Sequence, residues 1–72
     1  MQMTPLKSSN LHSVGYAAGT LRVQFHSGDI YDYLGVSPAT YTGLLAAKSP
    51  GTFLHQRIKG KFKAHPVKKA KA

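Results

Sequence analysis

The sequence of 72 residues contains no cysteine, no tryptophan and no glutamate, and only two acidic side chains. Without cysteine the chain has neither a disulfide framework nor a thiolate metal site, so a domain of this size must rely on a small apolar core. Long apolar runs are lacking too, and none of the short ones fits a secretory signal or a membrane span. We therefore expect one small cytoplasmic domain without membrane association.

Catalytic groups are scarce. The only carboxylates, Asp29 and Asp32, fall in an expected turn and on the wet face of an expected strand, where general acid-base chemistry is poorly supported. No nucleophile-elbow or phosphate-loop pattern is present. The histidines lie at least ten residues apart, which does not match the spacing of metal ligands: His12, His26, His55 and His65. The sequence predicts a non-enzymatic protein with no metal and no other cofactor.

Positive charge is what the sequence has in excess. Ten lysines and arginines against two acids give a formal net charge of +8. Seven of the ten follow residue 56, where no acid accompanies them: Arg57, Lys59, Lys61, Lys63, Lys68, Lys69 and Lys71. The preceding residues carry three positive and two negative charges. This asymmetry predicts a localised electropositive surface that attracts phosphate-rich partners.

The first half of the chain has the alternation of β-strands. In residues 20–26, Leu21, Val23 and Phe25 alternate with polar side chains, which predicts a strand with one buried face. A preceding strand around residues 14–16 is separated from it by a turn at Ala18-Gly19, and residues 30–34 form a third. The pattern predicts a three-stranded antiparallel meander.

The loop between the second and third strands determines where two tyrosines point. A two-residue loop would place Asp32 opposite Val23, on the core face, whereas a three-residue loop over residues 26–28 places Tyr31 opposite Val23 and Tyr33 on the same face. The three-residue loop ends on a glycine, which accepts the left-handed backbone that such a loop requires. Burying an unpaired aspartate is costly. We therefore expect both tyrosines to face the helices and Asp32 to face water.

Two helices should follow, because Ser37-Pro38 and Ser49-Pro50 each combine an N-cap hydroxyl with a proline at the first helical position. The apolar residues of each helix repeat at helical spacing: Tyr41, Leu44 and Leu45 in the first, and Phe53, Leu54 and Ile58 in the second. Gly60 should end the second helix. We expect an α+β domain over residues 10–63, with both short helices packed on one face of the sheet. Residues 1–9 should be a flexible N-terminus and residues 64–72 a disordered basic tail.

The order of these motifs resembles the KTSC domain family between about Ser8 and Phe62. The motifs that carry the resemblance are Val14-Gly15-Tyr16, the central Tyr31-Asp32-Tyr33, Gly35-Val36-Ser37-Pro38, Ser49-Pro50-Gly51-Thr52-Phe53 and Ile58-Lys59-Gly60-Lys61-Phe62. This family is named for the C-terminus of some lysyl-tRNA synthetases and also includes small stand-alone proteins. The resemblance implies a small module for which RNA binding has been suggested from the synthetase context.

Charge and resemblance together predict a module that binds nucleic acid, either RNA or DNA, with RNA favoured over DNA. The basic residues at the end of the second helix and beyond it would contact phosphates: Arg57, Lys59, Lys61 and Lys63. The strand residue Arg22 would contribute to this basic surface. Tyr31 and Tyr33 either pack in the core or stack on bases, and the expected register favours the core. The alternative function is a protein-interaction accessory with an incidental basic tail. The exposed edge of the third strand leaves both a monomer and a weak dimer open.

Overall fold

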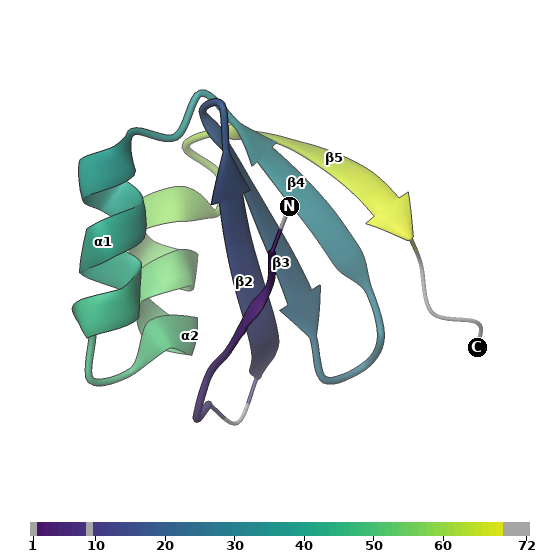
Figure 1. Cartoon of the computed structure of the whole chain (residues 1–72), viewed down its shortest axis with the longest axis vertical. Coiled ribbons are helices and arrows are strands. Elements are labelled where there is room, and N and C mark those ends of the chain that lie inside the picture. Colours follow the sequence, from purple (N-terminus) through teal and green to yellow (C-terminus); the bar gives the residue numbers. More distant parts are fainter. Residues whose placement is uncertain (1, 9, 69–72) are drawn as a thin grey trace.

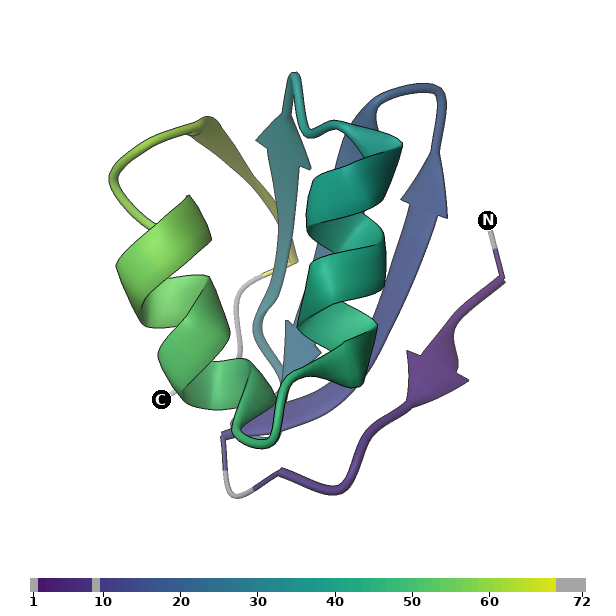
Figure 2. The same cartoon turned by 90° about the vertical axis from the view of Figure 1, so that its left-hand side faces the viewer.

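A computed structural model describes residues 2–8 and 10–68. Its sheet has five strands in the order β1-β2-β3-β4-β5, and every neighbouring pair is antiparallel. The strands are β1 (Thr4–Pro5), β2 (Leu11–Ala17), β3 (Thr20–Phe25), β4 (Ile30–Leu34) and β5 (Lys63–Lys68). Between β4 and β5 the chain forms α1 (Pro38–Ala46), α2 (Pro50–Phe53) and a π-helical turn, η1 (Leu54–Ile58). Both helical segments cover the same face of the sheet (Figures 1 and 2).

The central hairpins have the predicted register. Tyr31 pairs with Val23 and Tyr33 pairs with Leu21, and the backbone N–H of Phe25 donates to the carbonyl oxygen of Asp29, so that residues 26–28 form a three-residue loop. Its last residue, Gly28, has a φ of 101°, which a residue with a side chain adopts only under strain. Both tyrosines consequently lie on the helix-covered face.

The core lies between this face and the helices. Leu44 of α1 and Leu54 and Ile58 of α2–η1 meet the buried side chains of the sheet. The sheet and the loop after β4 contribute Leu11, Val14, Leu21, Val23, Tyr33 and Val36. Leu11 reaches this face because a bulge between Leu11 and Ser13 shifts the pairing of β2 with β3. The prediction that Leu45 belongs to the buried apolar face of the first helix was wrong. Leu45 is 40% exposed, because only one side of α1 meets the sheet.

The ends of the chain correct the predicted fold class. Five strands are present where the pattern predicted three, and the predicted flexible ends supply the other two. Thr4 and Pro5 pair with β2, and residues 63–68 pair with β4 over its whole length. The edge of β4 that was expected to be free is therefore covered. β5 gave no sequence signal because all its side chains are exposed, and main-chain pairing to a distant strand leaves no apolar pattern. The rest of the predicted tail, residues 69–72, lies outside the described residues.

Candidate functional site

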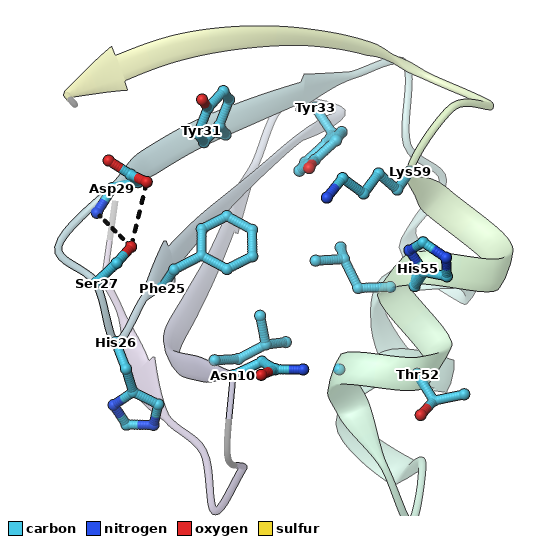
Figure 3. A pocket seen from close by; sticks show the side chains of 13 residues that line it. Asn10, Phe25, His26, Ser27, Asp29, Tyr31, Tyr33, Thr52, His55 and Lys59 are labelled. Atoms are coloured by element: carbon cyan, nitrogen blue, oxygen red, sulfur yellow. Dashed lines mark hydrogen bonds between the residues drawn. The ribbon is translucent and has the colours of Figure 1, made fainter. Parts of the chain in front are cut away.

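A groove of about 690 Å³ lies between the β3–β4 hairpin and the α2–η1 segment (Figure 3). The apolar part of its lining comes from both layers of the fold: Leu11, Phe25, Tyr31, Tyr33 and Leu54. The register explains this composition, because Phe25, Tyr31 and Tyr33 all project from the sheet toward the helices. At this groove the core is therefore open to solvent.

Two aromatic rings of the groove, those of Phe25 and Tyr31, meet edge to face. The rings of Phe25 and Tyr31 are nearly perpendicular, with 6.0 Å between their centroids and an interplanar angle of 81°. In this arrangement one ring points its edge at the face of the other. Both faces of the first ring therefore remain outside the contact between the two rings. The groove thus holds ring surface that a further planar group can contact.

Tyr33 is the most enclosed of these aromatics, with 3% of its surface exposed. Its hydroxyl is directed toward the groove, where the side chain of Lys59 extends in its direction (Figure 3). Burial raises the pKa of the Tyr33 hydroxyl above its ordinary value, and the neighbouring Tyr31 raises it further. The hydroxyl accordingly remains a neutral hydrogen-bonding group at the pH of a cell.

One wall of the groove is fixed by polar contacts around His26. Its Nε2 donates a hydrogen bond of 2.7 Å to the carbonyl oxygen of Ser8, and its backbone N–H donates to the carbonyl oxygen of Asn10. The Ser8 hydroxyl in turn accepts from the backbone N–H groups of Asn10 and Leu11. The loop after β3 is thereby tied to the segment that enters β2, which places the Asn10 side chain at the groove.

The opposite wall belongs to the second helical segment. His55 belongs to η1 and Lys59 directly follows it in extended conformation, and both line the groove. Gly51 of α2 approaches Asn10 so closely that a Cβ at this position would lie 3.1 Å from the Asn10 Nδ2. The groove is therefore narrow beside Asn10, while Lys59 lies at its other end, near β5 (Figure 3).

Exposed positive charge begins at that second end and continues along β5. Five of the eight lysine and arginine side chains within residues 2–8 and 10–68 belong to the segment from Arg57 to Lys68, and all five are exposed. In β5, Lys63 pairs with Leu34 and Lys68 pairs with Ile30, which places both lysines on the sheet face away from the helices. Lys59 lies on the groove side, and Lys61 lies in the loop that enters β5. We call these four lysines the basic edge.

Residues 7–62 match the sequence profile of the KTSC domain. The chain belongs to the KTSC domain family. The crystal structure of a KTSC domain protein from Yersinia pestis has the same fold, with a TM-score of 0.88 and 35% sequence identity, and the match covers 93% of this chain and 97% of that one. The predicted resemblance is thus confirmed over nearly the whole domain.

Relatives of this KTSC domain occur alone and inside a larger enzyme. A protein of Tsukamurella paurometabola is 38% identical over 64 residues, which are 86% of this chain and 96% of that protein. An uncharacterised protein of Stutzerimonas stutzeri is 39% identical over 61 residues, covering 82% and 86% of the two chains. A lysine–tRNA ligase of Nostoc punctiforme is 43% identical over 44 residues, which are 61% of this chain and only 8% of the ligase.

The fold of the KTSC domain separates the residues that its sequence singled out. Tyr31, Tyr33 and Lys59 line one groove, and Lys61 and Lys63 follow Lys59 along the basic edge. Arg57 is exposed on η1 but does not line the groove, and Arg22 lies on the other face of the sheet, paired with Asp32.

Sequence reasoning missed the groove residues that come from distant segments, above all Asn10, His26 and His55. No local signal marks them, because only the packing of α2–η1 against the sheet brings them together. It also missed that His12 and His26 are neighbours, with ring centroids 5.7 Å apart. Within residues 2–8 and 10–68, no three histidine or acidic side chains gather closely enough to hold a metal ion. No helix in this part of the chain is long and apolar enough to cross a membrane.

Proposed function

We propose that this KTSC domain binds nucleic acid in the cytoplasm, RNA in preference to DNA, through its basic edge and the adjacent Arg57. The observation that carries the proposal is the concentration of exposed positive charge between Arg57 and Lys68, beside a groove lined with aromatic rings. A run of lysines binds phosphates by releasing their counterions and needs no catalytic group. The proposed activity is binding alone.

The small number of acids supports this assignment. Asp32 is one of only two acidic residues, and it is bonded to Arg22. The other, Asp29, lies in the loop before β4, at the groove and outside the segment of Arg57 to Lys68. Because the chain has only two acids against ten cations, most of its positive charge is available to a phosphate backbone.

The relative within a lysine–tRNA ligase supports RNA as the polymer. That enzyme acts on tRNA, as its name states, and the segment that resembles this chain forms a small part of it. A domain attached to such an enzyme is useful if it holds the RNA substrate near the catalytic part. We extend that role, as a proposal, to the stand-alone domain.

Salt dependence tests the proposal directly. If the five cations between Arg57 and Lys68 each neutralise one phosphate of a single strand, the affinity falls by roughly a hundredfold between about 50 and 200 mM salt. Fluorescence anisotropy of a labelled RNA strand, titrated with the full chain at several salt concentrations, measures this slope. An affinity that does not change with salt, or no binding at low salt, contradicts the proposal.

A matched pair of charge variants separates the basic edge from net charge. The variant Lys61→Gln/Lys63→Gln and the control Lys7→Gln/Lys48→Gln each remove two exposed lysines and leave the same total charge. We expect the first to weaken binding and to reduce the salt slope by about 1.4 for a single strand, because two phosphate contacts are lost. The control should keep nearly the original slope. Equal losses of RNA affinity in both variants would mean that binding depends on the total charge of the chain and not on the position of the lysines.

A further inference from the structure

The groove has the size and the lining of a ligand site. Its volume of about 690 Å³ falls within the range of about 300 to 1,000 Å³ that is usual for small-molecule sites. Its lining combines aromatic and aliphatic side chains with a few polar groups, which is the composition such sites share. The ring surface of Phe25 and Tyr31 makes a flat aromatic ligand the best complement.

The polar groups of the groove are arranged unevenly along it. At the narrow end, the side-chain amide of Asn10 lies against Gly51 and offers both a donor and an acceptor. At the other end, the ammonium group of Lys59, the first lysine of the basic edge, offers positive charge (Figure 3). A ligand that matches these two ends has a flat part with hydrogen-bonding groups, which meets Asn10, and an anionic group, which meets Lys59.

We propose that the groove accepts one unpaired base of a bound single strand, with the base against Phe25 and Tyr31 and its phosphate directed to Lys59. This inference rests on the proposed function, since the basic edge first holds the backbone. The base edge then meets Asn10, and the neighbouring phosphates follow the basic edge along β5. The groove would thereby select single-stranded over double-stranded nucleic acid.

The reason for that selection is steric. A base within a duplex is stacked on both faces and paired along its edge, so it cannot enter a cleft between a sheet and a helix without leaving the duplex. An unpaired base has free faces, and stacking on an aromatic side chain stabilises it whatever its identity. The site therefore distinguishes unpaired from paired bases, and it distinguishes one base sequence from another only weakly.

A fluorescent base reports on the groove itself. A short RNA strand with 2-aminopurine at its centre is titrated with the full chain, and the same sequence is tested as a duplex. We expect the 2-aminopurine fluorescence of the single strand to change on binding and the duplex to bind more weakly. Salt-dependent binding without any fluorescence change, and with equal affinity for the duplex, would overturn the base site and leave the proposed function intact.

Substitutions of Tyr31 test whether the ring is the contact. Tyr31→Leu keeps apolar bulk but removes the aromatic face, so the single strand should bind about tenfold more weakly and the fluorescence change should be lost. Tyr31→Phe keeps the ring and should retain both. Thermal unfolding of each variant shows that it is folded, and duplex binding, which uses the basic edge alone, should be the same for both.

The outcomes separate the two proposals. If Tyr31→Leu binds the single strand as tightly as the original chain, the base site is wrong and binding belongs to the basic edge. If the original chain binds neither strand at low salt, the proposed function fails and the base site fails with it. Should Tyr31→Leu not fold, the Lys59→Met variant and its control Lys61→Met decide. Each removes one charge of the basic edge, but only Lys59 lines the groove, so only Lys59→Met should reduce the fluorescence change.

Discussion

Arg22 and Asp32 face each other across β3 and β4 and are joined by two hydrogen bonds, 2.8 Å from Nε to Oδ1 and 3.0 Å from Nη2 to Oδ2. The carboxylate raises the pKa of Arg22 above its ordinary value, chiefly through this hydrogen bonding. The two charges cancel on the sheet face away from the helices. Arg22, although a basic strand residue, is thus engaged within the fold, and the proposed phosphate contacts do not depend on it.

The neutral variant Arg22→Gln/Asp32→Asn tests this separation. It keeps the net charge, and we expect the free energy of unfolding to fall by no more than about 1 kcal/mol, the size of a partly exposed cross-strand pair. RNA affinity, measured by anisotropy at low salt, should stay within about twofold of the original. A tenfold loss of affinity in a folded variant would mean that Arg22 itself contacts phosphate.

The two Ser-Pro motifs predict the same cap but make different contacts. The Ser37 hydroxyl accepts a hydrogen bond of 3.2 Å from the backbone N–H of Thr40, whereas the Ser49 hydroxyl donates to the Thr52 hydroxyl and caps no backbone group. Ser37→Ala should therefore lower the free energy of unfolding by about 1 kcal/mol, and Ser49→Ala by clearly less. Urea denaturation measures both. Equal losses would show that the sequence motif, and not the observed bond, determines the cap energy.

β5 should stabilise the domain although its side chains are exposed. A chain that ends at Phe62 loses every main-chain bond between β4 and β5, and we expect the free energy of unfolding to drop by about 2 kcal/mol or more. The uncovered edge of β4 should also promote self-association. Urea denaturation and sedimentation velocity measure the two effects. A chain that ends at Lys68 is the control because it keeps all of β5. Similar stability of both truncated chains would contradict a structural role for this strand.

The raised pKa of Tyr33 makes stability depend on alkaline pH. The folded chain holds this proton more tightly than the unfolded chain, whose tyrosines titrate near the ordinary value of 10.0. The contribution of the protonated Tyr33 hydroxyl to the free energy of unfolding is therefore fully present below about pH 10, and it is lost as the pH rises through the pKa of Tyr33 in the folded chain. In an ultraviolet absorbance titration, one of the four tyrosines should ionise later than the others, and Tyr33→Phe should remove that late step. Tyr16→Phe is the control, and a late step that survives Tyr33→Phe would refute the assignment.

The sequence by itself determined the central hairpins and the starts of both helices, because these depend on local chemistry. The three-residue loop before Asp29 follows from the glycine at its end and from the cost of burying Asp32, and it fixes the face of Tyr31 and Tyr33. A serine before a proline similarly marks the first turn of a helix without reference to the rest of the chain. The resemblance to the KTSC family rested on the order of these local signals.

Tertiary structure alone decided β5 and the groove. β5 forms because the edge of β4 offers unpaired backbone groups. The sequence of β5 does not indicate a strand, because it contains Pro66 and three charged or histidine side chains and no buried residue. The groove exists only where α2–η1 stands away from the β3–β4 hairpin, and it gathers Asn10, Phe25 and Lys59 from segments that share no sequence pattern. Local propensity sets how each segment begins and turns, but which side chains meet across the fold depends on long-range pairing and packing.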